Sequence, residues 1–343
     1  MQKINLSDKL NMISKMTFTR FFNLVKLQLS YLLSNVLSRP IIWGVPISVS
    51  IEPTTACNLS CPECPSGLKS FTRPTGTIRI DSFKQNIDKI FKETLYLNFY
   101  FQGEPFLHKN FLDMVSYASS KGMYTATSTN AHFFNDEIAK KTIQSGLDRL
   151  IISIDGVTQD VYEQYRIGGD LSTVLNGVSN LVSWKKKLGS KTPMIVFQYL
   201  VVKPNEHQID EATALAKGLG VDDIWFKTAQ IYDHQRDPNS LIPTIDKYSR
   251  YKKVATGESM LKSTMRSNCW KMWHSNVITW DGQVVPCCFD KDASHVMGNI
   301  TTSSMKEIWK NNKYGSFRHE LIKSRKNIDI CSNCSEGLKV WAS

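Results

Sequence analysis

Three cysteines lie close together in the segment TTACNLSCPECPSG, which runs from Thr54 to Gly67. Cys57, Cys61 and Cys64 follow a C-x3-C-x2-C spacing, and no fourth cysteine lies nearby in the sequence. Cysteine thiolates bind iron–sulfur clusters, and a cubane cluster has four irons to ligate. Three thiolates leave one iron open, as a reactive metal site requires. The alternatives are zinc and plain core cysteines, although structural zinc sites prefer paired C-x2-C units with two further ligands.

Six short apolar runs alternate with helical segments after residue 46, and these elements must position the cysteines. Several helical segments open on Asp or Asn and close at Gly, as capped helices do. The pattern predicts an α/β fold with a parallel sheet, and six units favour an incomplete (β/α)6 TIM-like barrel. Functional groups should then gather where the strands end, and the cysteines follow the first run. The expected strands are Pro46–Glu52, Leu95–Phe101, Tyr124–Thr129, Arg149–Asp155, Met194–Val202 and Asp223–Thr228.

The chain is expected to divide into four segments. The barrel occupies residues 46–230, after an N-terminal helical extension at 1–45. A helical bridge at 231–265 leads to a small, cysteine-rich α+β domain at 266–343.

Composition places the protein among folded, globular chains. With 343 residues and 41% hydrophobic content, it is long enough to bury a full core. Its eight cysteines do not indicate a secreted disulfide scaffold, because such scaffolds are short and the N-terminus lacks a signal peptide. We therefore expect reduced thiols and a cytoplasmic protein. Nucleic acid is not an expected partner, since no basic–aromatic stripe is present.

The N-terminal extension predicts one amphipathic helix that Pro40 ends. Residues 1–45 hold six basic side chains and one acidic side chain, Asp8. A membrane span is not expected, because Lys26 near its centre would cost roughly 3 kcal/mol. The favoured interpretation is that the helix packs on the following domain, and the alternative is that it lies on an anionic membrane surface. Its apolar stripe is Phe18, Phe22, Val25, Leu29, Leu32 and Val36.

The cysteine motif after the first strand of a βα barrel resembles the radical SAM superfamily. In that family a [4Fe–4S] cluster on three cysteines binds S-adenosylmethionine through its open iron. The resemblance implies this role for Cys57, Cys61 and Cys64. Many members carry an apolar residue where this chain has Glu63, which leaves the role of Glu63 without an explanation.

Further strand-end motifs support the resemblance and imply cofactor contacts. QGEP at 102–105 is similar to the Gly-Gly-Glu motif that receives the methionine amino group, although Gln102 replaces the first glycine. STNAHF at 128–133 has Ala131 where the family has glycine, and SIDG at 153–156 leads to an arginine. The cofactor-binding residues implied are Gly103, Glu104, Ser128, Asn130, Ser153 and Arg166.

The five remaining cysteines resemble the C-terminal SPASM extension of the same superfamily. Asp281-Gly282 predicts a hairpin, and a helix is expected from about Ser304. The resemblance implies one auxiliary [4Fe–4S] cluster, with Cys287 preferred to Cys288 because G-x4-C matches the family element. A zinc ribbon on the same four cysteines is the alternative. The implied auxiliary ligands are Cys269, Cys287, Cys331 and Cys334, and Cys288 is expected to be a buried core residue.

The resemblance implies an oxidoreductase that forms a 5′-deoxyadenosyl radical and removes a hydrogen atom from its substrate. An auxiliary cluster favours net oxidation, such as dehydrogenation or cross-link formation. A low-potential electron donor such as flavodoxin or ferredoxin is an implied partner. The substrate is a small molecule or a peptide. One alternative is a maturase of a ribosomally made peptide that acts with a separate leader-binding partner, because one helix leaves no room for a fused leader reader. The alternative from another class is a non-catalytic, zinc-binding interaction protein.

Overall fold

A computed structural model describes residues 6–254, 257–262, 267 and 269–334 of the chain. Parts of the predicted N-terminal extension, the bridge and the C-terminal domain lie outside the described residues. These parts are 1–5, 255–256, 263–266, 268 and 335–343.

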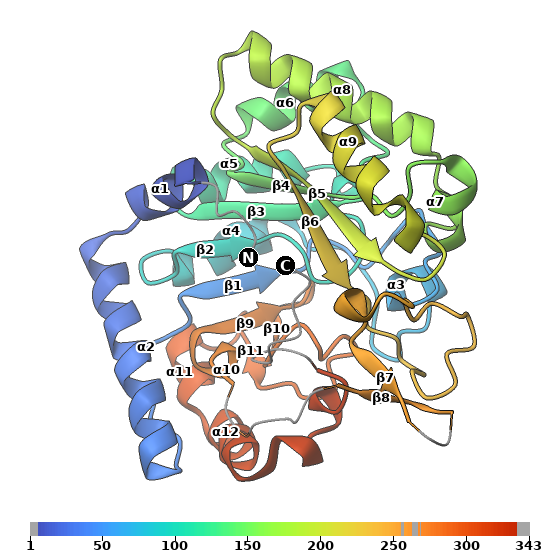
Figure 1. The fold of residues 1–343 in the computed structure, drawn as a ribbon. Coiled ribbons are helices and arrows are strands. Elements are labelled where there is room, and N and C mark those ends of the chain that lie inside the picture. Colours follow the sequence, from blue (N-terminus) through green and yellow to red (C-terminus); the bar gives the residue numbers. More distant parts are fainter. Residues whose placement is uncertain (1–5, 255–256, 263–266, 268, 335–343) are drawn as a thin grey trace.

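One mixed sheet organises the described molecule, in the order β11-β10-β9-β1-β2-β3-β4-β5-β6 (Figure 1). Strands β1 to β6 pair in parallel, each with the next, as the incomplete barrel predicts. A separate two-stranded sheet pairs β7 with β8. The strands are β1 (Ser48–Ile51), β2 (Tyr96–Asn98), β3 (Tyr124–Thr129), β4 (Arg149–Ser153), β5 (Met194–Val201), β6 (Asp223–Thr228), β7 (Tyr251–Lys253), β8 (Ser259–Leu261), β9 (Ser275–Ile278), β10 (Gln283–Val285) and β11 (Gly298–Asn299).

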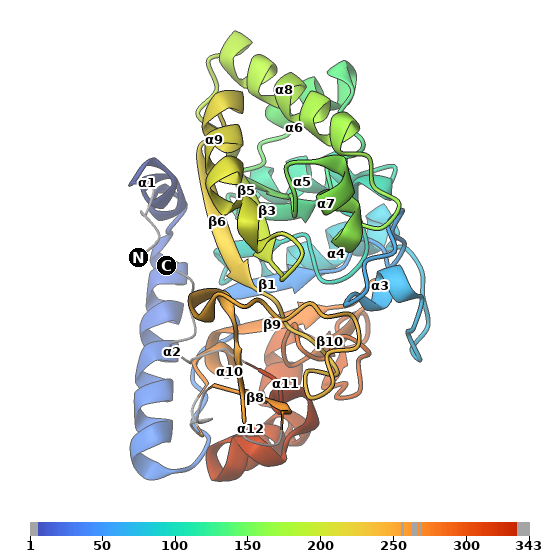
Figure 2. The ribbon, with the colours of Figure 1, turned by 45° about the vertical axis from the view of Figure 1, so that its right-hand side comes forward.

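Helices connect the parallel strands and cover the outer face of the barrel (Figures 1 and 2). Asn135 and Asp170 accept hydrogen bonds from the first turns of α6 and α8, and Gly220 ends α9 in the left-handed conformation. The helices are α1 (Leu6–Ser14), α2 (Phe18–Leu37), α3 (Pro65–Leu68), α4 (Ile80–Ile90), α5 (Phe111–Ser120), α6 (Asp136–Gln144), α7 (Gln159–Tyr165), α8 (Leu171–Lys187), α9 (Ile209–Leu219), α10 (Lys271–His274), α11 (Met305–Lys310) and α12 (Asn312–Ser324). Single 3-10 turns lie at Pro105–Leu107, Glu206–Gln208, Asp246–Tyr248, Arg325–Asn327 and Asp329–Cys331.

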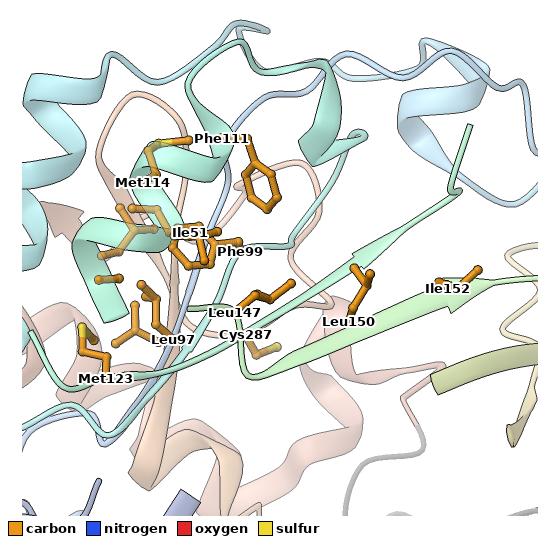
Figure 3. Close-up of a cluster of buried hydrophobic side chains, with 14 of the residues drawn as sticks. Ile51, Leu97, Phe99, Phe111, Met114, Met123, Leu147, Leu150, Ile152 and Cys287 are labelled. Carbon is orange, nitrogen blue, oxygen red and sulfur yellow. The ribbon is translucent and has the colours of Figure 1, made fainter. Parts of the chain in front are cut away.

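The main core lies between the sheet and its covering helices. Figure 3 shows Ile51 and Leu97, from β1 and β2, beside Phe111 and Met114 of α5. The ring centroids of Phe99 and Phe111 are 5.7 Å apart in an edge-on arrangement. Because this core extends to Cys287, it joins the barrel to the C-terminal domain.

The C-terminal domain continues the barrel sheet. Strand β9 pairs in parallel with β1, and β10 returns antiparallel to β9 through the predicted turn. Helix α11 begins after a capping box in which Ser304 and Glu307 bond to each other's backbone N–H. The expected helical bridge at 231–265 is different: its described part contains one 3-10 turn and the β7–β8 hairpin.

Helix α2 packs on the following domain, as favoured, but through the face opposite the apolar stripe. Arg20, Asn23, Ser30 and Ser34 are the buried polar residues of α2. They bond mainly to backbone groups, which compensates the burial of polar atoms. No helix in the described ranges has the length and apolar content needed to cross a bilayer.

Candidate active site

The three-cysteine loop lies at the carboxyl end of β1 and lines a cavity of about 330 Å³. Cys61 is buried, while Cys57 and Cys64 are half-buried. Burial raises the pKa of the Cys57 thiol to about 11, and it also raises that of Cys61. Cluster binding must therefore displace thiol protons, as metal sites with cysteine ligands do. Three thiols that face one cavity fit the donor set of a cluster with one open iron.

The turn after β2 is held directly against this loop. Gly103 has a φ of +75°, and an added Cβ would lie 2.2 Å from the Thr54 carbonyl oxygen. Its N–H donates to Ser66 Oγ at 2.9 Å, and the Glu104 N–H donates to the Ala56 carbonyl at 2.8 Å. Only glycine suits that position. Gln102 has no positive φ, so its backbone tolerates a side chain where the family has glycine.

Glu104 is the buried carboxyl group of the cavity. Its oxygens accept hydrogen bonds from Thr129 Oγ1 and the Asn130 N–H, both at 2.8 Å, and from the Phe106 N–H at 3.1 Å. Burial raises the pKa of Glu104 to about 7, against the opposing effect of these donors. A cation that entered the cavity would restore the charged form.

Ser128, Asn130 and Ser153 extend the lining across the ends of β3 and β4. Ser128 Oγ and Ser153 Oγ are 3.3 Å apart, and Asn130 Nδ2 donates to Asn58 Oδ1 at 2.7 Å. The second bond ties the β3 motif to the cysteine loop. Ala131, in place of the family glycine, is buried with a φ of +64°. A left-handed alanine carries backbone strain that glycine would not.

Arg166 is fixed between a carboxylate and a thiol. Its Nε donates to Asp155 Oδ2 at 2.5 Å, and its Nη1 lies 3.8 Å from Cys61 Sγ. Asp155 is fully buried, and its other oxygen accepts from the Leu200 N–H at 2.7 Å. Sequence analysis named Arg166 but missed its partner, Asp155. Asp155 is the aspartate of the SIDG motif, so its place at a strand end could have indicated it.

Glu63 binds a distant loop, which explains its presence beside the third cysteine. Its Oε2 accepts from the Tyr232 N–H at 2.8 Å, in the segment that follows β6. Sequence reasoning missed this role because the partner is a backbone group far along the chain.

Three further cations line the cavity, and sequence analysis also missed them. Lys227 is the residue before the last one of β6, so the strand-end rule could have found it. Arg250 lies in the segment before β7, where its Nε donates to Thr228 Oγ1 at 2.8 Å. Lys291 follows Cys288 and lies over the Tyr232 ring, 4.8 Å from its centroid. Neither of these two has a local sequence signal.

The four predicted auxiliary cysteines are all buried in the C-terminal domain. Cys269, Cys287 and Cys331 belong to the main core, and burial raises the pKa of Cys287 and of Cys331. Arg325 Nη2 donates to Cys334 Sγ at 3.0 Å. Buried thiols beside a guanidinium fit a site for a thiolate-bound group.

Cys288 has different neighbours, and it is less buried than expected. It is half-buried and packs with Phe101, Val277 and Val285.

Across the described ranges, no three His, Cys, Asp or Glu side chains converge on a point that would hold a single metal ion.

Comparison with known proteins identifies two domains. Residues 51–216 match the radical SAM superfamily, and residues 269–335 match SPASM, described as an iron–sulfur cluster-binding domain. The second match favours an iron–sulfur cluster over zinc at the auxiliary cysteines. The chain therefore carries a [4Fe–4S] cluster with S-adenosylmethionine, together with an auxiliary cluster.

Individual relatives are similar over most of the chain. The cofactor-modifying protein of a tungsten-containing aldehyde ferredoxin oxidoreductase from Pyrococcus furiosus is 26% identical over 314 residues, 83% of this chain and 86% of that protein. A mycofactocin maturase from Mycobacterium tuberculosis is 24% identical over 311 residues, 84% of this chain and 75% of the relative. Other relatives are matched over about half of their own length.

A solved structure shows the same fold at low sequence identity. The enzyme anSMEcpe, with bound AdoMet and a Cp18Cys peptide, has a TM-score of 0.60 at 20% identity, covering 87% of this chain and 91% of that one. With the fold, the strand-end motifs and both domain matches in agreement, this chain belongs to the radical SAM superfamily as an iron–sulfur enzyme with a C-terminal SPASM domain.

Proposed function

We propose that this enzyme performs a net oxidation that begins with hydrogen-atom removal from an anionic substrate. The observation that carries the proposal is the shared cavity, which the three-cysteine loop, Glu104 and Arg166 line together with three further cations. Bound in that cavity, the cluster and S-adenosylmethionine would supply a one-electron cleavage that gives methionine and a 5′-deoxyadenosyl radical able to remove the hydrogen atom. A flavodoxin or ferredoxin would provide the electron.

The chain's own residues bind and orient the cofactor. Cys57, Cys61 and Cys64 would hold the cluster, and the Glu104 carboxylate would pair with the methionine ammonium group. Ser128, Asn130 and Ser153 would supply hydrogen bonds along the cofactor. Arg166, fixed by Asp155, would hold a positive charge beside the Cys61 thiolate and toward the cofactor carboxylate.

The second cysteine set supports net oxidation over rearrangement. A substrate that has lost a hydrogen atom becomes an oxidised product when it releases one more electron and a proton. Cys269, Cys287, Cys331 and Cys334 would hold a fully ligated cluster, which supplies a one-electron acceptor rather than a substrate-binding iron. Dehydrogenation and cross-link formation both fit this electron count.

The cations favour a substrate with a carboxylate or phosphate group. Lys227, Arg250 and Lys291 line the cavity, and burial lowers the pKa of Lys291. Glu63, which accepts from the Tyr232 N–H, also acts electrostatically on Lys291. An anionic group that entered the cavity would gain further Coulomb attraction from these cations. Both a small acid and an acidic peptide provide such a group, and the relatives include a peptide maturase.

The proposed chemistry predicts a specific product. Anaerobically reconstituted protein, given dithionite and S-adenosylmethionine, should form 5′-deoxyadenosine, detected by chromatography and mass spectrometry. Cys61→Ala should abolish the product, because the cluster loses one of its three ligands. Cys288→Ala is the matched control and should retain wild-type activity. Wild-type protein that carries its clusters but yields no 5′-deoxyadenosine would contradict the proposal.

Iron content tests the two ligand sets separately. Wild-type protein should hold about eight irons per chain, as two cubanes require. The Cys331→Ala/Cys334→Ala double variant should retain about four, and so should a variant that lacks Cys57, Cys61 and Cys64. Cys288→Ala should keep the full content. One or two zinc ions per chain in place of the auxiliary iron, or iron loss in Cys288→Ala, would refute the assignment.

Glu104 should make cofactor binding pH-dependent. Its carboxyl is protonated below a pKa of about 7, so its attraction for an ammonium group is lost as the pH falls. Between pH 8 and pH 6, the affinity of the wild type for S-adenosylmethionine should fall about tenfold more than that of Glu104→Gln, measured by calorimetry. Glu63→Gln is the control and should keep the wild-type slope. Equal slopes for wild type and Glu104→Gln would exclude this role.

A further inference from the structure

Helix α2 carries its polar side inward and its apolar side outward. Arg20 is 2% exposed, and its guanidinium donates to the backbone carbonyls of Lys15, Phe91 and Gly122. Asn23 Nδ2 donates to the Val45 carbonyl at 2.9 Å, and Asn23 Oδ1 accepts from the Val45 N–H at 3.0 Å. These bonds fix the rotation of the helix, because turning it over would leave buried carbonyls without these donors.

The outward face of α2 is a continuous apolar stripe. At about 100° per residue, its six positions lie within roughly 40° of one line, opposite the buried polar side chains. Phe18 and Val36, at the two ends, are 80% and 78% exposed. The Phe18 and Phe22 rings lie against each other, with centroids 4.4 Å apart. The stripe consists of Phe18, Phe22, Val25, Leu29, Leu32 and Val36, of which all but the half-buried Val25 are exposed.

Helix α1 adds a second apolar face at the same edge of the molecule, as Figures 1 and 2 show. Leu6, Leu10 and Ile13 follow helical spacing, and each is more than half exposed. Trp43, in the segment after α2, is also exposed. Exposed apolar patches of this extent on a folded protein indicate a surface that another phase or partner covers.

The charges around these faces are basic. Lys9, Lys26 and Arg39 are exposed on or beside the two helices. Lys310 of α11 lies nearby, because the charge of Lys26 contributes to lowering the pKa of Lys310. The acidic side chain of this region, Asp8, is buried in an ion pair with Arg149. Exposed aromatic and aliphatic groups flanked by cations are typical of helices that lie on anionic bilayers.

We propose that α1 and α2 bind the enzyme peripherally to an anionic membrane, with both helices in the plane of the bilayer surface. The stripe and the Leu6, Leu10 and Ile13 face would enter the headgroup region, and the lysines would contact lipid phosphates. The proposal does not depend on the catalytic one, because it rests on residues outside the cavity.

The proposed attachment leaves the active site open to water. Arg20 and Asn23 donate hydrogen bonds to the carbonyls of Phe91, Glu93 and Gly122. These three residues lie just before β2 and β3. The two helices therefore cover the amino ends of the strands, whereas the cavity lies at their carboxyl ends. The enzyme would face the aqueous phase with its substrate cavity while it is held at the membrane.

Vesicle flotation of the full, cluster-loaded chain tests the proposal. Wild type should float with phosphatidylcholine vesicles that contain a quarter phosphatidylglycerol, and at least tenfold less with phosphatidylcholine alone. Phe22→Ser/Leu29→Ser/Leu32→Ser should lose flotation, because it removes apolar side chains that would enter the headgroup region. These side chains are exposed, so the variant should keep its fold. Leu188→Ser/Ile245→Ser/Met260→Ser, three exposed apolar residues elsewhere, is the matched control and should float like wild type. Lys26→Glu/Arg39→Glu should weaken the preference for the anionic lipid.

Other results would overturn membrane binding. Membrane binding is refuted if the wild type does not float, or if the wild type and the stripe variant float equally. A wild-type dimer in sedimentation that the stripe variant abolishes, without vesicle binding, would assign the surface to a second copy of the chain. The melting temperature of each variant should match the wild type, and 5′-deoxyadenosine formation reports separately on the catalytic site.

Discussion

The active site depends on the close approach of two loops at the carboxyl ends of β1 and β2. Gly103 lies so near the Thr54 carbonyl that a Cβ would be 2.2 Å from its oxygen. This contact, with the Glu104 N–H bond to Ala56, sets the cysteine loop and the buried carboxyl group at fixed positions. Asn130, bonded to Asn58, adds the third strand end to the same assembly. One backbone packing arrangement thus positions the three cysteines and Glu104, which we propose as the cluster ligands and the partner of the ammonium group.

The second cysteine domain is coupled to the first through the sheet and through the cavity wall. Strand β9 pairs with β1, the strand that leads to the cysteine loop. Glu63 anchors the segment after β6, and Asn333, between the last two cysteines, donates to the Ile231 carbonyl at 2.7 Å and accepts from Tyr251. Residues of both domains therefore line the cavity, which is consistent with the proposed role of the auxiliary cluster in the same reaction.

Local pattern predicted the elements well, and long-range packing explains what it missed. The strands Tyr124–Thr129 and Asp223–Thr228 have the expected limits, since apolar runs bounded by polar turns leave little choice. The family resemblance implied Glu104 and Arg166, which both line the cavity, while Lys291 joins it only because two domains meet there. Periodicity identified α2 but suggested the wrong buried face, because Arg20 and Asn23 satisfy carbonyls that the sequence does not reveal. The sequence of the bridge at 231–265 did not indicate the β7–β8 hairpin.

The central claim is that the cluster on Cys57, Cys61 and Cys64 has an open iron that binds the cofactor. Electron–nuclear double resonance of the reduced Cys331→Ala/Cys334→Ala variant, with S-adenosylmethionine labelled at the amino nitrogen and the carboxylate oxygens, tests it directly. The account predicts hyperfine coupling from both labelled groups to the remaining cluster. A reduced cluster that shows no coupling to either label, with the cofactor bound, would contradict it.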